Sequence, residues 1–170
     1  AATGGRIDII QYRMTDPRHA DALIAAHQRG VPVRVIVGQR EYRFTNRFMH
    51  SYNIDRLIAA GIPVKQRHHD GWNHEKLALL HGQRMAIFGS QNMAETSGQY
   101  EHNYFTRKAW IYDWFDDQFE RKWNSAAETE PFVPLPPDVP SYRAPQTGST
   151  VQTTDVTLRW HAGFWAHKYD

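Results

Sequence analysis

The 170-residue chain contains no cysteine. This absence excludes disulfide bridges, thiolate metal sites and a thiol nucleophile. No apolar run approaches the ~20 residues that a membrane span requires, and the N-terminus does not resemble a signal peptide. Because the chain begins abruptly with Ala1-Ala2-Thr3, we expect that a signal or a further domain has been removed.

A large excess of charge of one sign is also missing, since the formal net charge is only +2. The charge is nevertheless uneven along the chain. Residues 1–70 contain eleven Lys and Arg against six Asp and Glu, whereas residues 71–128 contain six against eight. A basic first half suits a phosphate-bearing substrate, although many ordinary proteins show such an asymmetry.

Three short β-rich segments alternate with two segments of helical periodicity in the first 66 residues. The strands are expected near residues 7–12, 31–37 and 62–66. Asp16 and Pro17 suit the start of the first helix, and Gly30 suits its end. The order strand, helix, strand, helix, strand predicts parallel pairing with helices covering the sheet. We therefore expect an α/β fold with a mixed, largely parallel sheet.

A β-hairpin is expected next, with strands near 74–81 and 85–91. Because side chains alternate along a strand, His74 and Lys76 share one face, and Ser90 and Asn92 share one face. A three-residue loop at 82–84 places Lys76 opposite Ser90 and His74 opposite Asn92. One imidazole, one ammonium, one hydroxyl and one amide then converge on a patch that suits an anionic phosphate.

A strand near 100–105 and a long helix from about Lys108 to Ala127 complete the predicted domain. Aromatic residues recur along this helix every three to four positions. Such a stripe suits either a lipid-contacting surface or packing against the sheet. Packing is favoured, because stripes of this kind usually face a core.

The segments His74-Glu75-Lys76 and Gly89-Ser90-Gln91-Asn92 resemble the HxK and GSxN signature of the phospholipase D superfamily. Arg29-Gly30-Val31-Pro32-Val33-Arg34-Val35 also looks like the family's transition from helix to strand. The chain departs from the signature at one position, because His81 stands where the family usually has Asp. The gap to the glycine is also one residue longer.

The resemblance implies a phosphodiesterase in which one histidine attacks phosphorus and a second histidine protonates the leaving oxygen. Imidazole titrates near neutrality, which suits both roles. The implied catalytic residues are His74, Lys76, Ser90, Asn92 and Glu101, with Glu101 as the acceptor that fixes the tautomer of the nucleophile. The chain has no second HxK, so its partner motif is expected from a homodimer or from a missing half of the parent protein.

Two groups of residues around the motif are candidates for binding the substrate. Arg40, Arg43 and Arg47 follow the second predicted strand, and ligands of open α/β sheets bind at that end. The loop before His74, with His69 and Trp72, is expected to line the pocket. Although His68-His69-Asp70 is rich in potential ligands, its spacing matches no standard zinc motif. We therefore expect no metal and no cofactor.

The last 40 residues differ in composition from the rest. Six prolines between 131 and 145 indicate a semi-extended linker. Alternating residues at 155–160 and 164–169 resemble the first strands of a fibronectin type III-like module that is cut short. We expect a phospholipase D-like catalytic domain at 1–130, a linker at 131–150 and a partial β segment at 151–170.

The leading hypothesis is a secreted, extracellular or periplasmic phosphodiesterase that acts on a phospholipid or a related phosphodiester. A metal-independent nuclease is the alternative within the enzyme class, although a net charge of +2 is modest for binding a polyanion. The alternative of another class is a non-catalytic module that binds phosphate or phospholipid. His81 and the missing second motif favour that alternative.

Overall fold

The computed structural model describes residues 5–44, 48–67, 71–94, 100–163 and 166. These residues form two compact units, Ala1–Val133 and Pro134–Asp170, and each unit is described by itself. The first unit holds a seven-stranded sheet with strand order β6-β5-β4-β1-β2-β3-β7. Among the described residues, no helix is both long enough and apolar enough to cross a membrane.

The centre of the sheet consists of β1 (Ile7–Gln11), β2 (Val33–Val37) and β3 (Val64–Arg67). These three strands pair in parallel, which confirms the predicted parallel core. The four outer pairings are antiparallel and involve β4 (Lys76–Leu80), β5 (Met85–Gly89), β6 (Asn103–Thr106) and β7 (Thr129–Pro131). The predicted α/β architecture with a mixed sheet is therefore confirmed, with two of the six strand pairings parallel and four antiparallel, where a largely parallel sheet was expected.

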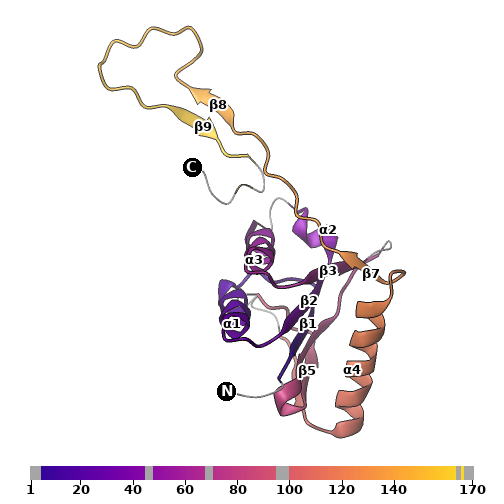
Figure 1. The fold of residues 1–170 in the computed structure, drawn as a ribbon. Helices are drawn as coiled ribbons and strands as arrows, with labels where there is room; N and C mark the ends of the chain where they lie inside the picture. Colours follow the sequence, from indigo (N-terminus) through magenta and orange to yellow (C-terminus); the bar gives the residue numbers. More distant parts are fainter. Residues whose placement is uncertain (1–4, 45–47, 68–70, 95–99, 164–165, 167–170) are drawn as a thin grey trace. The chain divides into compact units, whose positions relative to one another are not determined.

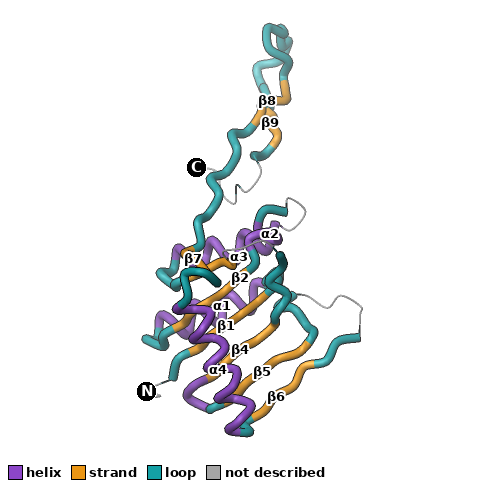
Figure 2. The backbone as a smooth tube through the Cα atoms, turned by 90° about the vertical axis from the view of Figure 1, so that its right-hand side faces the viewer, coloured by secondary structure: helices purple, strands orange, loops and turns teal. Residues whose placement is uncertain are grey.

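Helices cover both faces of the sheet. The helices α1 (Pro17–Gln28) and α3 (Phe48–Ala59) lie on one face, and α4 (Ala109–Asn124) lies on the other (Figure 1). A short helix, α2 (Gln39–Tyr42), follows β2 and was not predicted. Figure 2 shows the strands side by side, from β7 at one edge to β6 at the other.

Local chemistry explains the start and the end of α1. The Asp16 carboxylate accepts a hydrogen bond from the backbone N–H of Arg18 at 3.0 Å, and Pro17 opens the first turn. Past the end of the helix, Gly30 has a φ of 87°, which glycine adopts without strain. The sequence therefore predicts both limits of this helix correctly.

The predicted three-residue loop of the hairpin is wrong. In the structure, Leu77 pairs with Phe88 and Leu80 with Met85, so four residues, 81–84, connect the strands. His81–Gln83 form a 3-10 turn, and Arg84 adopts a left-handed φ of 46°. This register turns Leu77 and Phe88 toward α4, where the Phe88 ring lies 4.7 Å from that of Phe115. Burial of apolar side chains thus determines the register, and Lys76 lies level with Gly89 instead of Ser90.

A buried carboxylate joins the sheet to α4 at the end of the strands where the hairpin turn lies. Asp8, with no exposed surface, accepts hydrogen bonds from Arg34 at 2.8 Å, from Arg6 at 2.8 Å and from His81 Nε2 at 2.7 Å. The Tyr112 hydroxyl of α4 lies 2.6 Å from His81 Nδ1. The Asp8 carboxylate can only accept, so His81 Nε2 donates to it. In a neutral His81 ring, Nδ1 then accepts a hydrogen bond from the Tyr112 hydroxyl. β1, β2, the hairpin turn and α4 are therefore linked by one polar network.

Burial by itself raises the pKa of Asp8, but the hydrogen bonds and charges of Arg34, His81 and Arg6 lower it, from an ordinary value of 3.8 to about 2. The carboxylate therefore stays ionised in the folded protein at any pH above that value.

The second unit contains β8 (Ser141–Ala144) and β9 (Arg159–His161), which pair antiparallel. The strand at 141–144 lies within the predicted linker, and β9 overlaps only the end of the predicted strand at 155–160. The other predicted strand, 164–169, lies outside the described residues except for Ala166. At the start of the predicted linker, Pro131 ends β7 and Phe132 packs against the Tyr42 ring at 4.7 Å, so the first unit extends beyond residue 130.

Replacing Asp8 with Asn should destabilise the first unit by about 3–5 kcal/mol, because it removes the buried carboxylate that three basic side chains share and leaves Arg34 only its partly exposed partner Glu120. Chemical denaturation of the purified chain measures this change. Asp21→Asn is the matched control, since Asp21 is an exposed carboxylate paired with Arg56 and should cost no more than about 1 kcal/mol. Equal effects of the two variants would contradict the network's importance.

The same experiment has a defined pH dependence. The folded pKa of Asp8, about 2, lies below its ordinary value of 3.8, so its stabilisation is present above pH 3.8 and is lost as the pH falls toward 2. The shift corresponds to about 2 kcal/mol. Between pH 5 and 2, the free energy of unfolding should therefore fall less in Asp8→Asn than in the unmodified chain.

Candidate functional site

Strand ends bring the motif residues to one edge of the sheet. The carboxyl ends of β1, β2 and β3 lie at this edge, because these strands are parallel. The antiparallel partners contribute the amino end of β4, the carboxyl end of β5 and the amino end of β6. His74, Ser90, Glu101 and Arg40 thus approach the edge from segments far apart in sequence. This is the edge at which open α/β sheets bind ligands.

His74 and Lys76 are in direct contact. The Lys76 Nζ lies 3.0 Å from His74 Nδ1 and donates a second hydrogen bond, of 2.7 Å, to the carbonyl oxygen of His74. Lys76 is buried, and its ammonium lies 5.2 Å from the centroid of the Tyr12 ring, whereas His74 is exposed. An ammonium has no acceptor atom, so Nδ1 accepts this bond and a neutral His74 carries its proton on Nε2.

The surroundings favour the neutral form of His74. Burial lowers the pKa of its imidazole, the Lys76 and Arg13 charges lower it further, and Glu41 opposes them. Burial also lowers the pKa of Lys76, with Glu101 raising it and Arg13 lowering it. A neutral imidazole beside a partly buried cation is an arrangement that suits nucleophilic attack on an anion.

The motif residues Ser90 and Asn92 have different environments. The backbone N–H of His102 donates to Ser90 Oγ at 2.9 Å, so this hydroxyl is held at the entry to β6. Gly89 permits the approach, because a Cβ there would lie 2.0 Å from the His102 carbonyl oxygen. Asn92 lines the same hollow as Lys76 and Gln11, and its Oδ1 is buried without a hydrogen bond.

Glu101 does not contact His74 in the structure. Its negative charge acts on Lys76, and no hydrogen bond joins the described atoms of Glu101 and His74. The carboxylate that acts on His74 is Glu41 of α2, which is buried and accepts from the Tyr12 hydroxyl at 2.7 Å and from Arg13 Nε at 2.6 Å. The sequence did not indicate Glu41, because a helix of four residues shows no periodicity.

A cationic and aromatic hollow of about 530 Å³ adjoins the motif. Arg40 and Arg43, two of the residues expected to bind the substrate, line it together with Arg67. The Trp72 ring stacks on Tyr12 at 5.8 Å, and the Arg40 guanidinium lies 4.6 Å from the Trp72 centroid. The other two candidates, Arg47 and His69, lie outside the described residues.

His19 is a further polar residue at the site that sequence reasoning did not select. It lies at the start of α1 and lines the hollow that contains Lys76 and Asn92. Its Nδ1 is 3.9 Å from Asp16 Oδ2 and makes no hydrogen bond. The signal in the sequence, a histidine three residues after a capping aspartate, is too common to identify such a position.

Asp8, His81 and Asp116 bring potential metal-ligating atoms within 4.8 Å of one another. The two guanidiniums of Arg6 and Arg34 already neutralise Asp8, so an added cation would meet strong repulsion. We interpret this group as part of the salt-bridge network. The alternative metal ligands His68-His69-Asp70 lie outside the described residues.

Two structures of known proteins resemble this fold over most of their length. Nuc, a phospholipase D family member from Salmonella typhimurium, matches with a TM-score of 0.61 and 20% identity, over 75% of this chain and 81% of Nuc. NucT from Helicobacter pylori matches with a TM-score of 0.56 and 16% identity, over 75% of this chain and 82% of NucT. Both likenesses concern the fold.

A third structure, polyphosphate kinase from Porphyromonas gingivalis, matches with a TM-score of 0.51 and 24% identity, over 66% of this chain and 20% of the kinase. The comparison with curated protein sequences finds no relative. The sequence profile described as "Cardiolipin synthase, PLD-like domain" matches residues 1–123, which include the whole edge with His74, Ser90 and Glu101. The chain therefore belongs to the family of phospholipase D-like domains.

Proposed function

We propose that this chain supplies one half of the active site of a metal-independent phosphodiesterase. The observation that carries the proposal is the contact of 3.0 Å between the buried Lys76 ammonium and the His74 ring, at a sheet edge where Asn92 shares the Lys76 hollow. The site thus combines a neutral nucleophile with donors for a phosphate.

In the proposed reaction, a ring nitrogen of His74 attacks phosphorus. A P–N bond forms, the P–O bond to the leaving group breaks, and an imidazolium from a second motif gives its proton to the leaving oxygen. Lys76 and Asn92 hold the non-bridging oxygens through donors that are already in place. Water or an alcohol, deprotonated by the second imidazole, then releases the product from the phosphohistidine. Ser90 is placed to brace this edge through its bond to the His102 backbone.

The resting contact implies a rearrangement when the substrate binds. Attack through Nε2 requires that the proton move to Nδ1, and Nδ1 is now occupied by the Lys76 bond. A phosphate oxygen is a stronger acceptor for an ammonium than a neutral imidazole, so Lys76 is expected to turn to the substrate. A carboxylate then has to accept Nδ1–H, and we keep Glu101 as the candidate because its charge already acts on Lys76.

A phospholipid is the leading substrate. The description of the family profile, a cardiolipin synthase domain, supports a lipid phosphodiester. Nucleic acid is the second candidate, and the hollow that Arg40, Arg43 and Arg67 line beside Trp72 is the observation that favours it. A secreted location and a fibronectin type III-like continuation of residues 151–170 stay predictions.

His74→Ala should lower the cleavage of bis(p-nitrophenyl) phosphate by at least about a thousandfold, because it removes the nucleophile. The assay contains a chelator, and His161→Ala, which changes an exposed histidine of β9, serves as the control. Protein denatured at alkaline pH, where the P–N bond is stable, and analysed by mass spectrometry should carry a p-nitrophenyl phosphoryl adduct on His74. Tight phosphate binding without turnover or adduct would instead support the non-catalytic module.

The source of the second imidazole can be measured in the same assay. Specific activity that rises with protein concentration indicates that a second copy of the chain supplies it. Activity that appears only when the parent protein is used indicates a second motif elsewhere in that protein. The two substrates are distinguished by phosphatidylcholine with ethanol, which yields phosphatidylethanol, and by plasmid DNA, which is nicked.

The acidic limb of the kcat/KM profile should lie below the ordinary histidine value of 6.5, since burial, Lys76 and Arg13 lower the pKa of His74. Activity requires the neutral ring, so it is present above that pKa and is lost as the pH falls through it. Arg13→Gln removes a cation and should move the limb to higher pH. Arg56→Gln, which changes a surface partner of Asp21, should leave it in place. An unmoved limb in Arg13→Gln would contradict the assignment.

Combined replacement of Arg40 and Arg43 by alanine should raise KM for an anionic polymer by roughly tenfold and should lower kcat less than that. The reason is that both arginines line the hollow beside the motif without contacting His74. Arg29→Ala, at an exposed helix end, is the control. A larger KM effect on DNA than on phosphatidylcholine supports the nuclease alternative, and unchanged kinetics on both substrates remove these arginines from the binding site.

A further inference from the structure

Three large aromatic side chains remain exposed on β6 and on the first half of α4. Trp110 and Trp114 on α4 are 72% and 55% exposed, and Tyr104 on β6 is 60% exposed. The inward residues of the same helix, Tyr112 and Phe119, are buried in the core. Core packing therefore explains the inward half of the aromatic stripe and leaves Tyr104, Trp110 and Trp114 unexplained. We call these three residues the aromatic patch.

Aromatic contacts support the patch from beneath. The Tyr104 ring stacks on Phe88 at 5.5 Å, Phe88 lies 4.7 Å from Phe115, and Phe115 lies 4.9 Å from Trp114. The lower rings are partly buried against the core. Tyr104 and Trp114 are thus held at the surface by a continuous row of rings, and little side-chain entropy remains to be lost when the patch is covered.

The charges beside the patch are predominantly positive. Arg107 and Lys108, both exposed, connect β6 to α4, and Arg84 of the neighbouring hairpin turn lies over the Tyr112 ring at 5.1 Å. Of the nearby acidic residues, Asp113 is paired with Arg84 at 2.6 Å, and the exposed Asp117, three residues after Trp114, is a negative charge that offsets these cations. The border of the patch therefore presents cations to an approaching surface.

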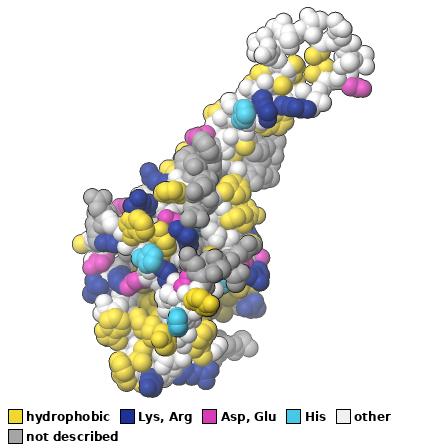
Figure 3. Space-filling view, turned by 180° about the vertical axis from the view of Figure 1, so that it is seen from behind, with side chains coloured by type: hydrophobic (Ala, Val, Ile, Leu, Met, Phe, Trp, Pro, Cys, Tyr) yellow, Lys and Arg dark blue, Asp and Glu magenta, His cyan; other side chains and the backbone are white. Residues whose placement is uncertain are grey.

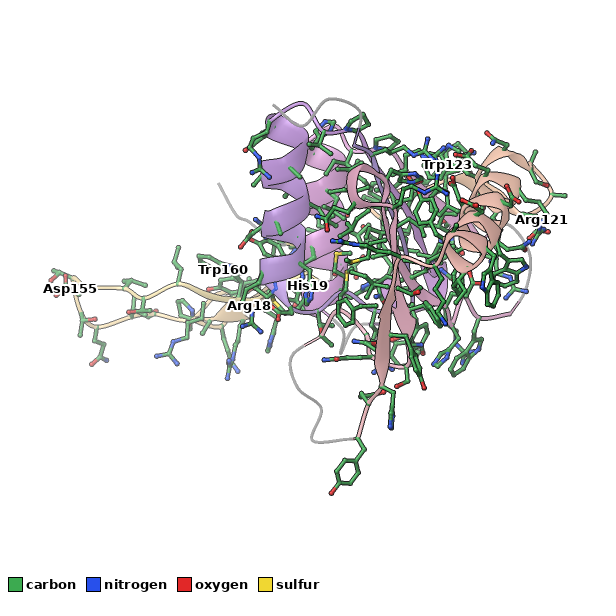
Figure 4. All side chains as sticks on the ribbon, turned by 90° about the horizontal axis from the view of Figure 1, so that it is seen from below. Arg18, His19, Arg121, Trp123, Asp155 and Trp160 are labelled. Atoms are coloured by element: carbon green, nitrogen blue, oxygen red, sulfur yellow. The ribbon has the colours of Figure 1, made fainter. Side chains whose placement is uncertain are left out.

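Hydrophobic side chains also gather on the surface of the domain near the edge of the sheet (Figure 3). Figure 3 faces the edge of the sheet formed by β6, and hydrophobic side chains gather at the lower end of this face above a group of Lys and Arg. Figure 4 shows Arg121 on the outer side of α4 and Trp123 on the side toward the sheet. Trp110 and Trp114 precede Arg121 by eleven and seven residues, so helical geometry puts them on its outer side.

The size of the patch decides between two occupants. A fully covered aromatic side chain buries 150–250 Å², so the exposed parts of these three rings offer roughly 400 Å². A stable protein interface requires about 800 Å² from each partner, which the patch does not reach. A membrane interface requires less, because tryptophan and tyrosine insert at the headgroup level and nearby lysine and arginine interact with anionic lipids.

We propose that the aromatic patch, bordered by Arg107 and Lys108, docks the domain on the surface of an anionic phospholipid bilayer. This docking is separate from the proposed reaction, since none of its residues lies in the motif. It also does not require that the lipid be the substrate: a nuclease of this family would use the same patch to stay at a membrane.

Vesicle sedimentation tests the proposal in a His74→Ala background, so that lipid turnover has no influence and a failed docking is distinguishable from a failed reaction. The chain should bind vesicles of phosphatidylcholine and phosphatidylglycerol more tightly than vesicles of phosphatidylcholine alone. Trp110→Ser with Trp114→Ser should weaken binding by roughly tenfold or more. Trp160→Ser is the matched control, because Trp160 of the second unit is 55% exposed, as Trp114 is.

A second pair of changes tests the charges. Arg107→Glu with Lys108→Glu should remove the preference for anionic vesicles while the thermal midpoint stays unchanged. Binding that survives both double variants would overturn the proposal. It would also be overturned if the tryptophan variant bound vesicles normally but lost self-association in analytical ultracentrifugation, because a second copy of the chain would then be the occupant.

Discussion

The fold depends on one buried carboxylate. Asp8 lies near the start of β1, a central strand of the sheet. A buried carboxylate without partners would be costly there, and Arg34 from β2 and His81 from the hairpin turn supply hydrogen bonds to it. These partners hold β1 against β2 and fix the far end of β4. The near end of β4 begins at Lys76, paired with Gln11 of β1. The network therefore positions the strand that carries the motif, although it lies at the opposite edge of the sheet from His74.

The same network explains the unusual His81. Where the family usually has Asp, this chain has an imidazole, and the carboxylate comes from Asp8 on the adjacent strand. Since β4 rises about 3.3 Å per residue, His81 is roughly 20 Å from His74 along the chain and does not touch the reacting atoms. The contacts of His81 with Asp8 and Tyr112 thus belong to the network that joins the strands to α4.

Local signals allowed much of the fold to be predicted, and tertiary contacts explain what was missed. The limits of α1 depend on Asp16, Pro17 and Gly30, which act on their own neighbours. The hairpin register depends on how Phe88 packs against Phe115, 27 residues later, and the residues of the turn do not predict this contact. Glu41 reaches the site through Tyr12, 29 residues away. Residues close in sequence, such as His74 and Lys76, could be placed together from sequence, whereas residues joined only by packing could not.

The His74–Lys76 contact describes a resting site whose activation depends on its substrate. While Lys76 donates to Nδ1, the Nε2 of a neutral ring holds a proton and cannot attack. An incoming phosphate competes for the Lys76 ammonium. When the ammonium binds the phosphate, His74 Nδ1 is free to carry the proton in place of Nε2. In the proposed reaction, the anion thereby creates the nucleophile that cleaves it. The same imidazole cannot also protonate the leaving oxygen in that step, because its attacking nitrogen is forming the bond to phosphorus. In the proposed reaction, the proton donor for the leaving oxygen must therefore be another group, which would make this edge of the sheet one side of a shared site.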